Sequence, residues 1–251
     1  MVESTLYQTA FLSLFNGLER SIVGDYSDYI QEIFAYDPVP DIPRWSNSPI
    51  LGLSPTLFIV ILKILEIRPF VPLVGTDRRK AIALHDELMC LELEFSKPGA
   101  NCADETVAKK MEACRDASQL FFWGAKILIL KLIYPTIQPQ TSLIQDQVTQ
   151  ARGILALQPT SLRYDQYLTW PLVILGLSSI HNHDKTLIRN IMQRAWDNTG
   201  CGDVKRSLAF LDRVWSDPAD ERAGNSRLGS EIFNTLDILV YKDGIFRFYG
   251  I

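Results

Sequence analysis

The sequence predicts an all-α protein, a single domain of about eight to ten stacked helices over residues 1–251. Three observations favour this fold class. Apolar residues recur at spacings of three and four along most of the chain, and segments with the alternating pattern of strands are scarce. The length of 251 residues, with 47% hydrophobic and 22% charged residues, suits one well-filled core.

The first half of the chain contains one short apolar helix and one long helix. The stretch ILGLSPTLFIVILKILEI, residues 50–67, is interrupted by charged residues, so it fits a buried helix better than a membrane span of about 20 apolar residues. Ser54 is placed to cap this helix and Pro55 to occupy its first turn. Residues 104–134 have apolar positions three and four apart and form one long helix ended by Pro135. Further helices are expected at 3–22, 26–36 and 76–96.

The second half continues the helical pattern. Residues 184–196 place six apolar side chains on one face, with Asp184 as the expected N-cap and Gly200 as the expected stop. Residues 203–215 repeat this design, with Asp203 as the expected cap. Further helices are expected at 141–157, 165–180 and 228–240. The tail YKDGIFRFYGI, residues 241–251, could add a short hairpin, because Asp-Gly favours a tight turn.

Charge and cysteine content exclude several function classes. The chain has 25 basic and 29 acidic residues and a net charge of −4, so we expect no direct nucleic-acid binding by this chain. The four cysteines contain no C-x-x-C pair, so they cannot build a zinc cluster at normal spacing. The N-terminal segment makes a poor signal peptide, which predicts an intracellular protein with reduced thiols and no membrane association.

Signatures of enzymes and cofactor sites are weak or missing. His181, His183 and Asp184 lie close together, but metal sites need three or four ligands, so we expect a polar turn between helices. The acidic stretch HDELMCLELE, residues 85–94, is interpreted as a solvated helix face. The chain has no G-x-S-x-G elbow and no phosphate-binding glycine loop. We therefore predict no catalytic residues, no metal and no cofactor.

One aromatic segment is a candidate lining for a ligand pocket. In QLFFWGAKIL, residues 119–128, three consecutive rings point in different directions and cannot all enter one helix–helix contact. Rings at the start of a second buried helix could close the opposite wall of a pocket. Simple core packing is the alternative, since apolar stripes usually belong to the core. The candidate pocket residues are Phe121, Phe122, Trp123, Tyr167 and Trp170.

The segment 169–215, which begins TWPLVILGLSS, resembles the C-terminal part of the regulatory domain of fungal zinc-cluster transcription factors. Both have a Trp-Pro-Leu start, a helix with small residues, a turn that contains glycine and a Val-Trp ending. The matching residues are Trp170, Pro171, Leu172, Gly176, Arg189, Gly200, Leu211, Val214 and Trp215. The segment 48–65, SPILGLSPTLFIVILKIL, resembles the family's apolar helix near the start of the domain. The six-cysteine zinc cluster of that family is not in this sequence. Within the resemblance, Trp170 and Trp215 are expected in the core, and Gly176 is expected to let another helix approach closely.

The resemblance implies a transcription-regulator-like protein, an effector domain without its own DNA-binding module. Its expected place is the nucleus, or cytoplasm and nucleus, with control of fungal secondary-metabolite genes as the expected context. A small apolar ligand, a protein partner or a homodimer would bias its helix packing. The alternative is a helical enzyme of secondary metabolism, such as a cyclase or isomerase, that reuses the fold and its cavity.

Overall fold

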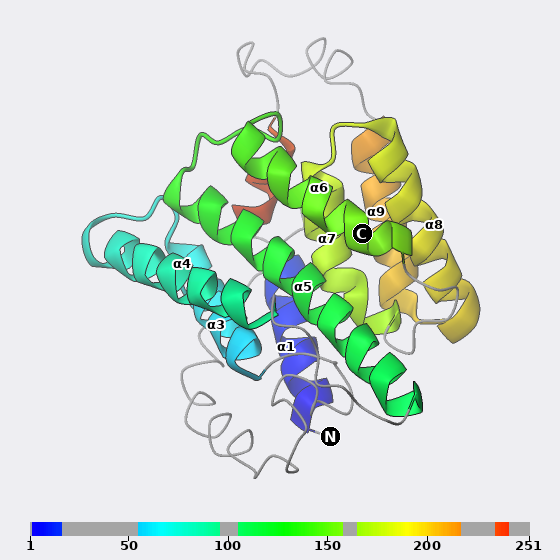
Figure 1. Ribbon diagram of the computed structural model, residues 1–251. Helices are drawn as coiled ribbons and strands as arrows, with labels where there is room; N and C mark the ends of the chain where they lie inside the picture. The colour runs from blue at the N-terminus through cyan, green and yellow to red at the C-terminus, as the bar shows by residue number, and fades with distance from the viewer. Residues whose placement is uncertain (1, 17–54, 96–104, 158–164, 217–233, 241–251) are drawn as a thin grey trace.

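The computed structural model describes residues 2–16, 55–95, 105–157, 165–216 and 234–240 (Figure 1). These residues form α-helices and 3₁₀ helices and no strand, so the all-α prediction is confirmed. The α-helices are α1 (Val2–Asn16), α3 (Pro55–Ile67), α4 (Gly75–Phe95), α5 (Glu105–Ile133), α6 (Ser142–Leu157), α7 (Thr169–Ser178), α8 (Asn182–Thr199) and α9 (Gly202–Ser216). The 3₁₀ helices are η2 (Arg68–Phe70), η3 (Asp165–Leu168) and η4 (Thr235–Val240). The helix predicted at 26–36, the cap at Ser54 and the hairpin at 241–251 lie outside the described residues.

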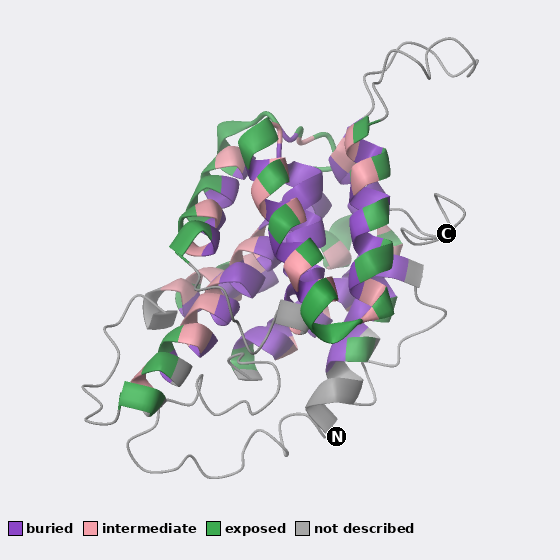
Figure 2. Ribbon diagram, turned by 90° about the vertical axis from the view of Figure 1, so that its right-hand side faces the viewer, coloured by how far each residue is buried: buried purple, intermediate pink, exposed green. Residues whose placement is uncertain are grey.

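The long helix α5 organises the molecule. It crosses the ribbon diagonally, with α3 and α4 on one side and α8 and α9 on the other (Figure 1). It packs against α3, α4, α6, α7 and η4. Its C-terminal part, residues 127–133, is buried at every position, because neighbours surround it on all sides. The outer helices instead bury one face and expose the other, as the apolar spacing predicts (Figure 2).

Helix α7 is the most enclosed element, since all ten of its residues are buried. Two glycines let neighbouring helices approach it closely. A Cβ built on Gly124 of α5 would lie 3.2 Å from Cζ3 of Trp170, and one built on Gly176 of α7 would lie 2.8 Å from Cδ1 of Leu211 in α9. The expectation that Gly176 permits a close helix contact is therefore confirmed. Trp170 is confirmed as a core residue, with 1% of its surface exposed.

Trp215 corrects the second core prediction. It is half-buried at the end of α9, and its Nε1 donates a hydrogen bond to the Gly176 carbonyl at 3.0 Å. The guanidinium of Arg189 lies over its ring at 5.2 Å from the centroid. A buried indole N–H needs a hydrogen-bond partner, and Trp215 finds one at the edge of the core. Through these two contacts Trp215 of α9 links α7 and α8.

The helix predicted over 165–180 is divided into η3 and α7. Pro171 explains the division. A continuous α-helix would need an N–H at residue 171 to bond the carbonyl four residues earlier, and the proline ring would clash with that carbonyl. The α-helix therefore starts at Thr169, where Pro171 falls in the first turn.

The two aspartate caps predicted for the next helices are wrong. Helix α8 begins at Asn182, two residues before Asp184, and its N-cap His181 makes no side-chain cap hydrogen bond. Helix α9 begins at Gly202, one residue before Asp203. In both helices the backbone carbonyl of an earlier residue, His181 or Cys201, accepts the first helical hydrogen bonds. The aspartate therefore lies in the first turn, where the helix dipole stabilises a negative charge. The stop at Gly200 is confirmed, with φ of 63° and its N–H bonded to the Trp196 carbonyl at 2.7 Å.

Two buried cations hold η4 against the rest of the fold. Arg68 is 4% exposed and donates to the carbonyls of Leu239 and Ser13, each at 2.5 Å. Lys131 of α5 is fully buried, and its Nζ lies 2.5 Å from Oδ1 of Asp237. The segment predicted as an α-helix over 228–240 forms a 3₁₀ helix at Thr235–Val240.

Candidate functional site

The predicted pocket residues divide into two groups. Phe121 and Trp170 stack on each other in the core, with ring centroids 5.6 Å apart and planes at 6°. Tyr167 lies edge-on to Tyr7 of α1, at 5.2 Å between centroids. These three predicted residues pack against core side chains, and none of them lines a groove in the part of the chain that the structure describes.

Phe122 and Trp123 face a different direction. Phe122 is buried and Trp123 is half-buried, and their rings meet edge-to-face at 4.7 Å. Both contribute to a groove beside α6. Consecutive rings on α5 thus point to different neighbours, as the helical geometry requires. The structure does not bring the five predicted residues to one place.

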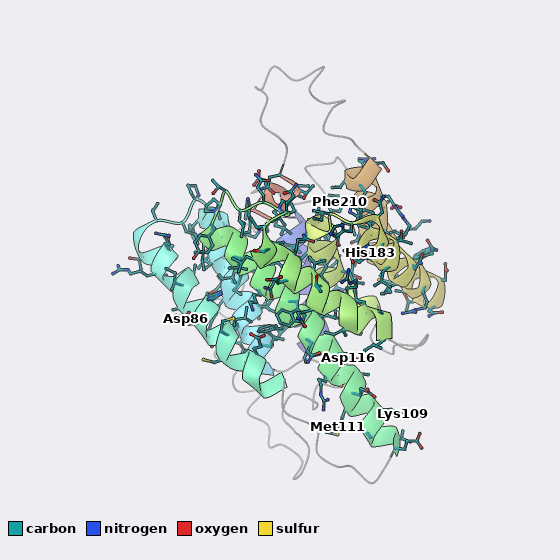
Figure 3. All side chains as sticks on the ribbon, turned by 45° about the horizontal axis from the view of Figure 1, so that its top comes forward. Asp86, Lys109, Met111, Asp116, His183 and Phe210 are labelled. Atoms are coloured by element: carbon teal, nitrogen blue, oxygen red, sulfur yellow. The ribbon has the colours of Figure 1, made fainter. Side chains whose placement is uncertain are left out.

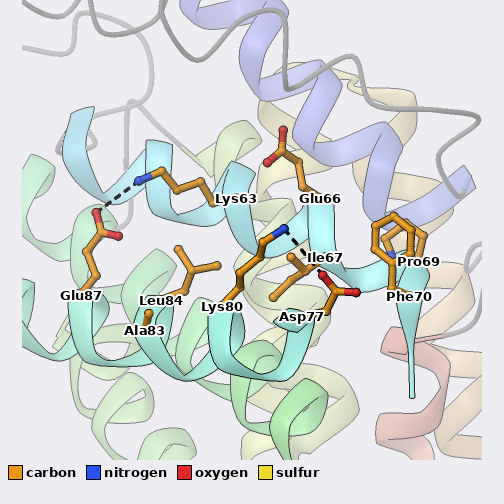
Figure 4. A pocket seen from close by; sticks show the side chains of 10 residues that line it. All are labelled: Lys63, Glu66, Ile67, Pro69, Phe70, Asp77, Lys80, Ala83, Leu84 and Glu87. Atoms are coloured by element: carbon orange, nitrogen blue, oxygen red, sulfur yellow. Dashed lines mark ion pairs between the residues drawn. The ribbon is translucent and has the colours of Figure 1, made fainter. Parts of the chain in front are cut away.

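A groove lies between α3, η2 and α4, and we call it the apolar groove (Figure 4). Its volume is about 750 Å³. Ile67 and Leu84 are buried at its base, and Phe70, with 62% of its surface exposed, stands at one end. The lining residues are Lys63, Glu66, Ile67, Pro69, Phe70, Asp77, Lys80, Ala83, Leu84 and Glu87. The volume falls in the range of small-molecule sites.

Charged side chains line the mouth of the apolar groove in pairs. Lys63 of α3 reaches across to Glu87 of α4, with Nζ 3.5 Å from Oε1 (Figure 4). Lys80 lies 3.7 Å from Asp77 within α4. Burial raises the pKa of the Glu66 carboxyl, and the charges of Lys63 and Lys80 oppose that rise. The groove therefore has an apolar base and a polar mouth, in which two of the three carboxyl groups are paired with lysines.

A second groove follows the contact between α5 and α6, and we call it the amide groove. Its volume is about 410 Å³. Helix α5 contributes Gln119, Phe122, Trp123 and Lys126, a set at helical spacing on one face. Helix α6 contributes Asp146, Gln147, Gln150 and Ile154, and α4 contributes Glu92. Three primary amides, a cation and an indole thus share one recess.

The acidic segment 85–94 does more than face solvent. Glu87 pairs with Lys63 of α3, and Glu92 lies 3.6 Å from Lys126 of α5. These two carboxylates tie α4 to both neighbouring helices. Spacing within one helix cannot reveal such pairs, because their partners lie on other helices.

The His181–Asp184 segment forms a polar cluster at the start of α8, where Figure 3 labels His183. The rings of His181 and His183 stack at 5.4 Å between centroids. His183 Nε2 lies 3.1 Å from Oδ1 of the buried Asp184, and Arg152 of α6 lies 3.6 Å from the same oxygen. The expected polar turn is therefore a link between α6 and α8.

The described residues contain no group of three or more His, Cys, Asp or Glu side chains arranged to hold a metal ion. Within the described residues, Cys90, Cys114 and Cys201 form no disulfide. Among the described helices, none is long and apolar enough to cross a membrane.

The sequence did not predict the apolar groove, and of the residues that line the amide groove it predicted only Phe122 and Trp123. The apolar groove depends on the angle at which α3 meets α4, and the only local signal was Phe70 directly after a proline. Glutamines 119, 147 and 150 have the pattern of an ordinary polar helix face. A groove made by two helices becomes visible only once their packing is known.

A family model described as the fungal specific transcription factor domain matches residues 9–226. The matched range contains both segments on which the resemblance rests, 48–65 and 169–215, so the predicted family is confirmed. No curated protein and no solved structure gives a significant match.

Proposed function

We propose, from the premise that this chain belongs to the family of fungal specific transcription factor domains, that it is a regulatory domain that responds to a small apolar ligand. A transcription-regulator-like role follows from the family match over residues 9–226, which carries this conclusion. The finer proposal is that it acts in the nucleus, on genes of secondary metabolism. DNA contact would come from a protein partner, which includes a second copy of the chain, because a net charge of −4 does not favour binding to phosphates.

The apolar groove supports the ligand proposal. A volume of about 750 Å³ accommodates a small organic molecule, and an apolar base with a polar mouth is the usual character of such sites. The opposite charges of the mouth compensate one another through Lys63–Glu87 and Lys80–Asp77. Because both lysines are already paired and Glu66 adds a third carboxyl group, this arrangement favours a neutral apolar molecule over an anion.

The position of the groove suggests how binding would change the domain. Helices α3 and α4 both pack against α5, which also contacts α6, α7 and η4. A ligand between α3 and α4 would favour the arrangement in which both helices contact it. The change in population is limited by the difference in ligand affinity between the two arrangements. Helix α5 would transmit this preference to the far side of the domain.

A neutral fluorescent probe tests the ligand site. N-phenyl-1-naphthylamine should bind the purified chain saturably, with one site per chain. Ala83→Phe places a ring at an exposed position of the apolar groove and should abolish this binding. Ile82→Phe places the same ring on the neighbouring exposed position outside the groove and should leave binding unchanged. Equal binding by wild type and both variants would remove the apolar groove as the ligand site.

A gel shift tests the expected lack of DNA recognition. The purified chain should show no sequence preference among duplexes at physiological salt, because specific recognition needs side chains that reach base edges from a positively charged surface. A retarded complex that survives excess nonspecific duplex would contradict this part of the proposal.

A further inference from the structure

The amide groove contains a buried acceptor that the fold leaves without a donor. Gln147 is 6% exposed, and its Nε2 donates to the Leu143 carbonyl at 3.0 Å. Its Oε1 is buried and has no hydrogen-bond partner among the described residues. Because nearly all buried polar atoms in folded proteins are paired, an unpaired acceptor on a residue that lines a groove indicates a missing donor.

Helix α5 contributes two aromatic rings to the lining of the groove. Trp123 is half-buried and meets Phe122 edge-to-face. Lys126 Nζ lies 5.1 Å from the Trp123 ring centroid and 5.6 Å from that of Phe122. The ammonium group thus holds both rings in place by cation–π attraction, which strengthens where water is excluded.

The charges of the groove select against anions. Lys126 has 12% of its side chain exposed and lies 3.6 Å from Glu92. Asp146 adds a further carboxylate to the lining. Lys126, the one cation among the described lining residues, is therefore already compensated, and an anionic ligand would face two carboxylates. The groove suits a neutral molecule.

The amides of α5 and α6 define the remaining contacts. Gln119 and Gln150 each carry a primary amide, which donates through its NH₂ and accepts through its carbonyl. A ligand amide can donate to Gln147 Oε1 and accept from one of these NH₂ groups at the same time. Two such bonds fix the orientation of a flat ligand beside Trp123.

We propose that the amide groove binds a neutral, planar molecule that carries a carboxamide or lactam edge with a free N–H. The N–H donates to Gln147 Oε1, and the ring lies against Trp123. This site is separate from the apolar groove, and neither site depends on the other. Its ligand would join α4, α5 and α6 across their shared contact.

Three matched probes test this chemistry: nicotinamide, N,N-dimethylnicotinamide and nicotinate. The indole N–H signals of the five tryptophans report binding by NMR, with Trp123 assigned through Trp123→Phe. Nicotinamide should move the Trp123 signal saturably, with a dissociation constant on the order of 10 mM, as expected for so small a fragment. The dimethyl compound lacks the N–H, and nicotinate is an anion, so both should bind at least about tenfold more weakly.

Gln147→Met tests the acceptor itself. The variant keeps the length of the side chain but removes Oε1, so affinity for nicotinamide should fall about tenfold, the effect of losing one good hydrogen bond. Substitution removes the unpaired Oε1 but also the bond from Nε2 to the Leu143 carbonyl, so the two effects oppose each other and the melting temperature should change by no more than about 4 °C. Gln193→Met makes the same change on the exposed surface of α8 and should bind nicotinamide like wild type.

The proposal is overturned if the Trp123 signal does not respond to nicotinamide at several times the expected dissociation constant. It is equally overturned if the three probes bind alike, or if Gln147→Met binds as tightly as Gln193→Met. A response confined to other tryptophans would place the fragment elsewhere and also contradict it.

Discussion

Substituting Gly176 by alanine tests how closely α7 and α9 are packed. The new Cβ would lie 2.8 and 2.9 Å from Cδ1 and Cδ2 of Leu211 and 3.2 Å from Cζ2 of Trp215. Leu211 is fully buried, so its methyl groups cannot move into solvent. Forcing a methyl group into a filled core costs about 1–3 kcal/mol.

The same substitution at Gly153 provides the control. This glycine lies within α6, is exposed, and has no atom within 4 Å of a built Cβ. Replacing glycine by alanine inside a helix stabilises it by about 1 kcal/mol, and this gain applies at both positions. Gly153→Ala should therefore be stabilising by about 1 kcal/mol, whereas Gly176→Ala should be less stable than Gly153→Ala by about 1–3 kcal/mol.

Urea unfolding measures this difference directly. Both variants should keep the wild-type m-value, so that a change in midpoint reports stability. For a chain of this size, each kcal/mol shifts the melting temperature by about 2–4 °C. If Gly176→Ala is stabilised as much as Gly153→Ala, the close contact between α7 and α9 does not exist as described.

Three further predictions concern one core tryptophan and two carboxylates. Trp170→Ala should lower the free energy of unfolding by about 3–5 kcal/mol, measured by urea unfolding, because it empties a core position; unchanged stability would contradict the placement of α7. Asp237→Ala should cost about 1–3 kcal/mol, because it removes the carboxylate partner of the fully buried Lys131; a double-mutant cycle with Lys131→Met should show coupling, and additive effects would refute the pair. Asp116 has a pKa raised to about 6, chiefly by burial and also by Glu112. Its contribution to stability is therefore largest below the unfolded pKa near 3.8 and is lost as the pH rises through about 6. The stability of Asp116→Asn relative to wild type should accordingly increase between pH 4 and pH 7, and a difference independent of pH would show that the carboxyl is not perturbed.

Helix positions followed from local pattern because burial repeats with the helical period. The stretch 104–134 gave α5 nearly to the residue, since Pro135 ends it and apolar side chains return every three or four positions. Gly200 was recognisable as a stop because its left-handed backbone favours glycine. Helix starts were harder to predict. Aspartate is a common N-cap residue, yet Asp184 and Asp203 lie inside the first turn of their helices.

The sites were harder to predict because they depend on contacts between distant segments. Phe122 and Trp123 were identified as pocket residues from their consecutive rings, and they do line a groove. Nothing in the local sequence indicated that Gln147 would oppose them, since a glutamine on an amphipathic helix usually faces solvent. Lys131 was hidden for the same reason, as its partner lies more than 100 residues away in the chain.

A tethered reporter assay tests the central claim that this chain is a regulatory domain of transcription. The full chain is fused to a heterologous DNA-binding domain, and transcription from a promoter with the matching sites is measured in a fungal host. We expect the fusion to change transcription several-fold relative to the DNA-binding domain alone. Trp170→Ala, which should destabilise the core by about 3–5 kcal/mol, should lower this effect on transcription toward that baseline. Transcription equal to the baseline with the wild-type chain, in a fusion shown to be folded and present on the promoter, would contradict the account.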